Sequence, residues 1–140
     1  MKKITPLADM KKIQIKNTGK TEFIKGNKEM LADLLVILLD NAVKYSHESS
    51  VINIQTSTKE GYVGIDIEDN GIGISKKDLP KIFERFYRAD TARSRDGYGG
   101  YGLGLPIAYN IAKLHHGNIT VKSIIGKGSV FTVKLPKGHK

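Results

Sequence analysis

A long amphipathic helix is the sequence feature that most constrains the fold of this chain. Asn27 is a residue type that caps helix N-termini, and the segment that follows, about 28–45, repeats its apolar residues at helical spacing. These apolar positions are Met30, Leu31, Leu34, Leu35, Leu38, Leu39 and Ala42. Because they form a stripe on one side of the helix, the helix must cover an apolar layer that the rest of the chain supplies.

Six further segments alternate apolar and polar residues, a pattern typical of strands with one buried face. They follow one another in pairs around short turn-forming sequences, so each pair predicts a β-hairpin. The predicted hairpins are 11–16 with 21–25 around Asn17-Thr18-Gly19, 51–58 with 62–68 around Lys59-Glu60-Gly61, and 119–123 with 129–135 around Gly126-Lys127-Gly128.

A second amphipathic helix is expected over 102–116, ended by Gly117, and one or two short helical turns are expected within 76–86. Helices and hairpins in one short chain predict an α+β fold. We expect a two-layer α/β sandwich in which about three helices cover one face of a mixed sheet of about five strands.

The composition fits a single soluble domain that can bind a polyanion. The chain has 140 residues, of which 39% are hydrophobic, and it lacks the apolar stretch of about 20 residues that a membrane-spanning helix needs. Without cysteines it can form neither disulfides nor thiolate metal sites. The formal net charge of +9 suits a polyanionic partner, which can be a nucleic acid, a membrane surface or a nucleotide, and the alternative is a plain basic surface. Because the basic residues are scattered and no nucleic-acid-binding motif occurs, no nucleic-acid partner is expected.

The N-terminal residues bear on where the domain begins and where it works. Residues 1–9 are expected to be the end of a preceding segment, and 10–138 are expected to be the domain itself. The N-terminus lacks the apolar core of a secretory signal. A cytoplasmic location is therefore expected, whether or not the parent protein is anchored in a membrane.

The end of the long helix carries the first candidate site. Asn41, Lys44 and Tyr45 lie three and four residues apart and therefore share one face of the helix. An amide oxygen, an ammonium group and an aromatic ring at such a place can hold a metal ion, a phosphate and a sugar or base. The alternative is an exposed helix end whose lysine simply lies near the negative end of the helix dipole.

Two short motifs follow along the chain. Asp69-Asn70-Gly71-Ile72-Gly73-Ile74 places a carboxylate at a strand end, where it can accept a hydrogen bond from an exocyclic amine, and its glycines let the backbone approach a planar ring. The alternative is an ordinary turn. The segment 82–88 combines three aromatic residues with two arginines, which suits phosphate contact, while Phe83 and Phe86 are interpreted as core residues.

A glycine cluster completes the set of candidate sites. Residues 97–108, GYGGYGLGLPIA, lead directly into the second predicted helix, whose first turn offers unpaired N–H groups and the positive end of the helix dipole. Such a combination is typical of phosphate binding, and the alternative is a plain mobile loop. The stretch 87–101 has little apolar patterning, which is typical of a functional or mobile loop.

Taken in order, these motifs resemble those of the ATP-binding domain of sensor histidine kinases, in the superfamily that includes gyrase B, the Hsp90 chaperones and the MutL repair proteins. The resemblance runs from about Gly26 to Pro136 and covers the N, G1, F, G2 and G3 boxes of that family, the last being 126–131. It implies a Bergerat-type ATP-binding fold that takes ATP and Mg²⁺. It also implies transfer of the γ-phosphate to a histidine on a separate dimerisation domain of the same parent protein, and from there to the receiver domain of a response regulator.

The resemblance further implies a role for each site residue. Asn41 would ligate Mg²⁺, and the catalytic residues would be Asn41, Lys44 and Arg88. The residues that would contact the phosphates or ribose are Lys44, Tyr45 and Arg88. Asp69 would bind the adenine amino group, in a base pocket completed by Gly71, Gly73, Ile74 and Thr132. Residues 87–101 would form the ATP lid. The nucleotide contacts in and after the lid would come from Tyr87, Gly100, Tyr101, Gly102, Leu103, Gly104 and Leu105.

This chain departs from the family in two respects. Members that hydrolyse ATP with water carry a glutamate four residues before the helix asparagine, whereas this chain has Ile37 there, so slow water-directed hydrolysis is predicted. The four histidines all lie outside the sequence setting of a phosphoacceptor, and each is interpreted as a surface residue: His47, His115, His116 and His139. The acceptor is therefore expected on another domain, and the isolated chain is expected to have little activity.

Two other functions remain open from the sequence. A protein serine kinase of the anti-sigma-factor type shares these boxes, but such kinases generally keep an acidic base near the helix asparagine, which Ile37 does not supply. A non-catalytic module that senses nucleotides through closure of its lid would bind ATP without transferring a phosphoryl group.

Overall fold

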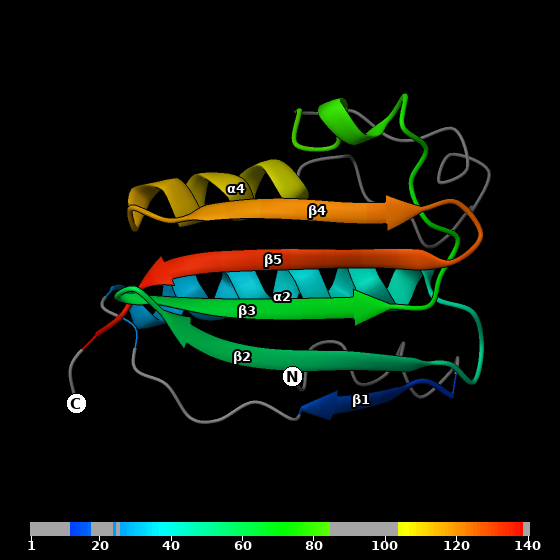
Figure 1. The fold of residues 1–140 in the computed structure, drawn as a ribbon, viewed down its shortest axis with the longest axis horizontal. Helices are drawn as coiled ribbons and strands as arrows, with labels where there is room; N and C mark the ends of the chain where they lie inside the picture. The colour runs from blue at the N-terminus through cyan, green and yellow to red at the C-terminus, as the bar shows by residue number, and fades with distance from the viewer. Residues whose placement is uncertain (1–11, 18–23, 25, 85–103, 139–140) are drawn as a thin grey trace.

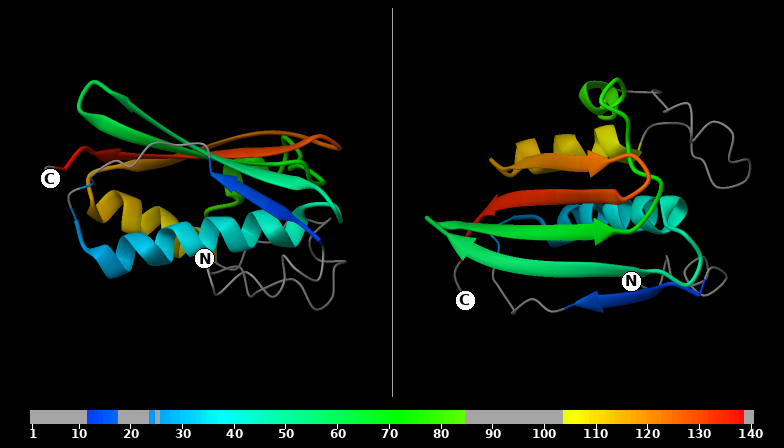
Figure 2. Two further views of the ribbon diagram at one scale, coloured as in Figure 1. Left: turned by 90° about the horizontal axis from the view of Figure 1, so that it is seen from below. Right: turned by 45° about the vertical axis from the view of Figure 1, so that its right-hand side comes forward.

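The chain folds into two layers, a sheet and a pair of helices (Figures 1 and 2). The structure, a computed structural model, describes residues 12–17, 24, 26–84 and 104–138. Its five-stranded sheet has the strand order β1-β2-β3-β5-β4. Figure 2 shows both helices, α2 and α4, on the same face of the sheet. The predicted two-layer α+β fold is therefore confirmed.

The sheet is mixed, as predicted. β1 (Gln14–Asn17) runs parallel to β2 (Val51–Lys59). The remaining strands are antiparallel to their neighbours: β2 with β3 (Tyr62–Asp69), β3 with β5 (Gly128–Pro136), and β5 with β4 (Asn118–Ile124). The hairpins predicted for β2–β3 and β4–β5 are confirmed, because short local turns connect strands that each have an apolar side.

Two α-helices and one 3₁₀ helix lie within the described residues, compared with the about three helices expected from the sequence. Helix α2 (Lys28–Tyr45) has the predicted bounds, and the side chain of Asn27 caps it by accepting the N–H of Met30 at 2.9 Å. Helix α4 (Gly104–Leu114) follows the glycine cluster, and the 3₁₀ helix η1 (Leu79–Lys81) is the short turn expected within 76–86.

The apolar core lies between the helices and the sheet. Helix α2 contributes Leu34, Leu38, Leu39, Ala42 and Val43 to it. Facing them are the odd-numbered residues of β3 and β5, among them Val63, Ile65, Ile67, Phe131, Val133 and Leu135. Because side chains alternate along a strand, the even-numbered residues of β3 and β5 point to the other face of the sheet.

The first predicted hairpin is wrong. β1 pairs in parallel with β2, with Gln14 opposite Val51, and Ile24 makes an isolated antiparallel bridge to Lys137. Residues 18–23 and 25 lie outside the described part of the chain. Alternation along 11–16 indicates which face of a strand is buried, but it does not specify the neighbouring strand. β1 pairs instead with the edge of β2 that β3 leaves open.

His115, a half-buried residue at the end of α4, links the two helices, a role that the sequence did not indicate. Its Nε2 accepts the backbone N–H of Asn27 at 2.9 Å, and its Nδ1 donates to the carbonyl of Ile111 at 2.8 Å. Gly26 lies against the ring, since a Cβ at this position would be 2.1 Å from the ring Cδ2. The start of α2 is thereby fastened to the end of α4. By contrast, His47 and His116 are exposed as expected, and residue 139 lies outside the described part.

His116 ends α4 in a conformation that favours glycine. Its φ is 62°, its N–H donates to the carbonyl of Lys113, and the next N–H, of Gly117, donates to the carbonyl of Ala112. We expect His116→Gly to raise the free energy of unfolding by about 0.5–1 kcal/mol, because the strain relieved in the folded state exceeds the entropy gained by the unfolded chain. Urea unfolding of both proteins measures the difference.

The matched control is Lys113→Gly. Lys113 is exposed and lies within the last turn of α4, so the same substitution is expected to lower the stability by about 1 kcal/mol. Changes of the same sign in the two variants would contradict the prediction.

Candidate functional site

Three segments converge at one end of the sheet, on the right-hand side of Figure 1. They are the C-terminal end of α2, the loop 69–74 after β3, and the turn between β4 and β5. The N–H of Ile72 donates to the carbonyl of Tyr45 at 3.1 Å, and the N–H of Gly126 donates to the carbonyl of Ile72 at 2.8 Å. The loop is therefore held between α2 and the hairpin, and motifs distant in sequence form one site.

Asp69 is a buried carboxylate in this region. Only 5% of the residue is exposed. Its Oδ1 accepts the N–H of Gly71 at 2.9 Å, and the backbone N–H of Ser129 also donates to the carboxylate. Desolvation by burial raises the pKa of Asp69 to about 6, although these two backbone hydrogen bonds lower it. At neutral pH the group is thus a charged acceptor in a place with little water.

Gly71 and Gly73 allow the loop to lie against its neighbours. A Cβ on Gly71 would be 2.1 Å from the carbonyl oxygen of Tyr45. Gly73 has a φ of 77°, and a Cβ there would be 2.2 Å from the carbonyl oxygen of Ile124. Beyond them, the N–H of Ile74 donates to Ser123 Oγ at 2.7 Å. The predicted nucleotide-binding residues 69, 71, 73 and 74 therefore lie in one loop that is fixed against α2 and the β4–β5 hairpin.

The three polar residues at the end of α2 are half-buried: Asn41, Lys44 and Tyr45. Lys44 Nζ lies 3.0 Å from Asp40 Oδ2, one helical turn away. Within the described ranges, no group of three acidic or histidine side chains could hold a metal ion by itself. A single amide oxygen, as on Asn41, fits Mg²⁺ that is bound together with phosphates, because Mg²⁺ keeps several waters and takes few protein ligands.

The predicted place of Thr132 in the base pocket is wrong. Its Oγ1 donates to Asp66 Oδ1 at 2.7 Å, on the face of the sheet away from the helices. The strand residue beside Asp69 is Ser129, which lies directly opposite it in the β3–β5 register and is 6% exposed. The alternation of side chains along the strand could have indicated this from the sequence. Phe131 faces the core, so Ser129 lies on the same face and Thr132 lies on the other.

The start of α4 meets α2 close to this region. A Cβ on Gly104 would lie 3.4 Å from Ile37 Cγ2, so the isoleucine that precedes Asn41 by one turn contacts the helix start. Leu105 is half-buried. The remaining predicted contacts lie outside the described residues: Tyr87, Arg88, Gly100, Tyr101, Gly102 and Leu103, with the expected lid 87–101.

Aromatic packing fastens the segment before residue 85. The Phe83 ring centroid is 5.1 Å from that of Tyr109 on α4 and 6.5 Å, edge to face, from that of Phe131 on β5. The interpretation of Phe83 as a core residue is therefore confirmed, and Phe86 lies outside the described part. Ser75 and Asp78 cap the turn before it, with Ser75 Oγ donating to Asp78 Oδ2 at 2.8 Å.

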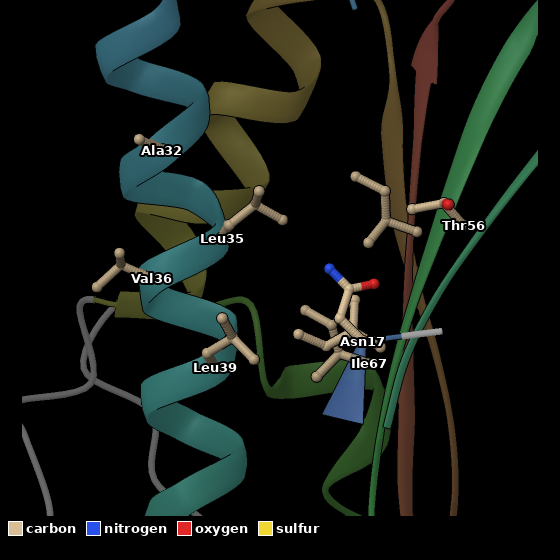
Figure 3. A pocket seen from close by; sticks show the side chains of 9 residues that line it. Asn17, Ala32, Leu35, Val36, Leu39, Thr56 and Ile67 are labelled. Atoms are coloured by element: carbon tan, nitrogen blue, oxygen red, sulfur yellow. The ribbon is translucent and has the colours of Figure 1, made fainter. Parts of the chain in front are cut away.

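An apolar pocket of about 300 Å³ lies elsewhere, between α2 and the β1–β3 part of the sheet (Figure 3). It is lined by Asn17, Ala32, Leu35, Val36, Leu39, Ile54, Thr56, Ile65 and Ile67. Figure 3 shows Leu35 and Leu39 on the α2 side and Asn17 and Ile67 on the sheet side. None of the predicted site residues lines this pocket, and its lining carries no charge, so it does not suit a triphosphate.

Comparison with known proteins assigns the fold and the site to a family. The pattern of the histidine kinase-, DNA gyrase B- and HSP90-like ATPases matches residues 26–139. The chain belongs to this family. It is 46% identical over 106 residues to the sensor protein CiaH of Streptococcus pneumoniae serotype 4, a match that covers 76% of this chain and 24% of CiaH. It is 45% identical over 112 residues to the sensor histidine kinase YkoH of Bacillus subtilis, and this match covers 80% of this chain and 24% of YkoH.

Solved structures agree with this family assignment. The mycobacterial sensor histidine kinase MprB superposes with a TM-score of 0.86 at 24% identity, covering 99% of this chain and 93% of that one, and shows the shared fold. Full-length ShkA in complex with AMPPNP superposes with a TM-score of 0.83 at 25% identity, and this match covers 99% of this chain and 28% of the ShkA chain. The chain spans about a quarter of the length of CiaH and YkoH and corresponds to the ATP-binding catalytic domain of sensor histidine kinases.

None of the helices that the structure describes is both long enough and apolar enough to span a membrane.

The raised pKa of Asp69 predicts a pH-dependent effect of Asp69→Asn on stability. The folded value of about 6 exceeds the ordinary 3.8, so the folded protein holds the proton more tightly than the unfolded chain. The stability from the bound proton is fully present below pH 3.8 and is lost as the pH rises through about 6. The variant lacks this titration, so its stability relative to the original should rise by up to about 3 kcal/mol between pH 4 and 7.

Urea unfolding of both proteins at several pH values measures this effect. The difference between the two free energies of unfolding is the quantity to compare, because all other groups titrate in both proteins. A difference that stays constant from pH 4 to 7, or falls, would show that burial does not raise the Asp69 pKa.

Proposed function

We propose that this chain holds ATP and Mg²⁺ and presents the γ-phosphate to a histidine on a separate dimerisation domain of a two-component sensor kinase. The phosphohistidine would then donate to the receiver domain of a response regulator. Because the first of these transfers uses intracellular ATP, the domain would work in the cytoplasm. The observation that carries this proposal is the buried Asp69 carboxylate at the end of β3, where the following loop is bonded to the end of α2 and to the β4–β5 turn.

Nucleotide recognition would begin at Asp69. A charged carboxylate with little water around it favours an N–H donor, and the exocyclic amine of adenine is such a donor. Gly71 and Gly73 let the loop pack closely against Tyr45 and Ile124, which fixes the backbone beside Asp69. Full-length ShkA, which shares this fold, forms a complex with AMPPNP, an ATP analogue, and this complex supports the same ligand class for this chain.

The triphosphate would lie toward the helix ends. Asn41 would hold Mg²⁺, which neutralises phosphate charge, and the first backbone amides of α4, at Gly104 and Leu105, would donate to phosphate oxygens. Lys44, which pairs with Asp40, would add positive charge. We also propose that Tyr45, Tyr87, Arg88, Gly100, Tyr101, Gly102 and Leu103 contact the nucleotide.

The proposed reaction is a direct phosphoryl transfer. A nitrogen of the acceptor imidazole attacks the γ-phosphorus, the bond from this phosphorus to the β–γ bridging oxygen breaks, and ADP leaves with the electron pair. The domain contributes position and charge stabilisation. No base on this chain has to activate the imidazole, which is a nucleophile in its neutral form.

The ligand assignment predicts that Asp69→Asn weakens binding of Mg²⁺-ATP by at least about tenfold, since the amide loses the charge and turns an N–H₂ group toward the ligand. Titration calorimetry of the folded variant measures the affinity. Asp66→Asn is the matched control, because Asp66 lies on the same strand but faces Thr132 on the other side of the sheet. Equal affinities of the two variants would argue against the base site at Asp69.

The choice of acceptor predicts slow ATP hydrolysis. Ile37 lies one turn before Asn41 and contacts Gly104, and its side chain cannot take a proton from water. We expect the domain with Mg²⁺-ATP to release phosphate much more slowly than it phosphorylates a supplied dimerisation domain. Labelled ATP follows both reactions in one sample.

Each other outcome of that experiment has a definite meaning. Rapid phosphate release without an acceptor would contradict the role given to Ile37. ATP binding without transfer to a competent dimerisation domain would favour a nucleotide-sensing module. Transfer to a serine of a partner protein would favour the serine kinase alternative.

A further inference from the structure

Ser123 on β4 forms the centre of a small hydrogen-bond network beside the candidate base site. Its Oγ lies 2.7 Å from the backbone nitrogen of Ile74, 2.9 Å from the carbonyl oxygen of Gly128 and 2.7 Å from Ser129 Oγ. The hydroxyl thus connects the loop after β3 to the hairpin strand that lies next to Asp69. The sequence-based site residues do not include it.

The chemistry of these partners determines the direction of each hydrogen bond. A backbone N–H can only donate, so Ser123 Oγ accepts from Ile74; a carbonyl can only accept, so the single Ser123 proton goes to Gly128. The contact between the two hydroxyls must therefore use the proton of Ser129. With one bond donated and two accepted, Ser123 Oγ has no capacity left.

Ser129 is consequently left with lone pairs only. Its proton is held by Ser123, and its residue is 6% exposed, opposite Asp69 in the strand register. Its backbone N–H donates to the Asp69 carboxylate, which places the two residues side by side on the helix-facing side of the sheet. Two acceptors, a carboxylate and a hydroxyl oxygen, are therefore carried by directly paired residues on the same side of the sheet.

We propose that Ser123 is a positioning residue that sets the hydroxyl polarity of Ser129, so that Ser129 and Asp69 together select a purine with an exocyclic amine over one with an oxygen at that position. This inference rests on the proposed binding of ATP at Asp69. An amine offers two N–H donors to the two acceptors, whereas a carbonyl oxygen would meet lone pairs.

Loss of the Ser123 hydroxyl has two separable effects. Ile74 and Gly128 lose a hydrogen-bond partner, which loosens the loop and weakens all nucleotides alike. In addition, the Ser129 proton is released and can turn toward a ligand oxygen. Only the second effect changes the ratio of affinities for two bases, so this ratio distinguishes a selectivity role from a merely structural one.

The experiment compares ATP with inosine triphosphate, in which an oxygen replaces the 6-amino group. Dissociation constants are measured with Mg²⁺ for the original domain and for Ser123→Ala, Ser123→Thr and Ser129→Ala. The original is expected to prefer ATP by at least about tenfold. Ser123→Ala should reduce this preference at least about fivefold, whatever its overall affinity, and Ser123→Thr, which keeps a hydroxyl, should retain it. Should the alanine variant fail to fold, Ser123→Cys provides the same comparison with a weak donor.

A double-substitution cycle tests whether Ser123 acts through Ser129. In a Ser129→Ala background, Ser123→Ala should leave the preference unchanged, because no hydroxyl remains to be oriented. An unchanged preference in the single variant Ser123→Ala, or a further loss in the double variant, would overturn the inference while leaving ATP binding intact. An original domain that binds both nucleotides equally would do the same. A domain that binds neither would overturn the proposed function, and this inference with it.

Discussion

The hydrogen bonds from the backbone to the buried carboxylate of Asp69 hold this site together. Gly71 donates from the loop that follows β3, and Ser129 donates from the strand beside it, so the carboxylate joins two donors that are 58 residues apart in the sequence. A buried charge is unfavourable unless its lone pairs are satisfied, and here two backbone donors do this only in part. The remaining acceptor capacity is what a ligand amine can use.

The two helices add a second constraint, because the site uses opposite ends of them. Helix α2 contributes its C-terminal half and α4 its N-terminal end, so the helices must run antiparallel and in register for these parts to lie together. At the far end, His115 accepts the N–H of Asn27 and fastens α4 to the start of α2. At the near end, Ile37 contacts Gly104. Nucleotide binding therefore depends on contacts that lie well away from the nucleotide itself.

The chemistry proposed for the domain follows from what the site contains and from what it lacks. An apolar residue occupies the turn before Asn41, and the acidic and histidine side chains in the described part of the chain do not gather into a metal site. Such a site can position a triphosphate and offset its charge, but the Ile37 side chain, one turn before Asn41, cannot activate water. Dependence on an external nucleophile is consistent with the family of sensor kinases to which CiaH and YkoH belong.

Local interactions are the part of this protein that could be predicted from the sequence. The bounds of α2, its Asn27 cap and the hairpins β2–β3 and β4–β5 depend on neighbours within a few residues, so spacing and turn residues were sufficient. The order of the motifs was likewise sufficient to indicate the family and to suggest a role for Asp69. The alternation of residues along β5 also indicates that Thr132 lies on the face away from the helices, although the resemblance to the family placed Thr132 beside the base.

Only the tertiary structure decided which distant groups meet. The parallel pairing of β1 with β2, the His115 link to Asn27 and the hydroxyl contact of Ser123 with Ser129 all depend on strand register and helix packing. A sequence pattern specifies which side of an element is buried, since this depends on hydrophobicity along one element. It does not specify the partner, because that choice minimises the free energy of the whole packed chain.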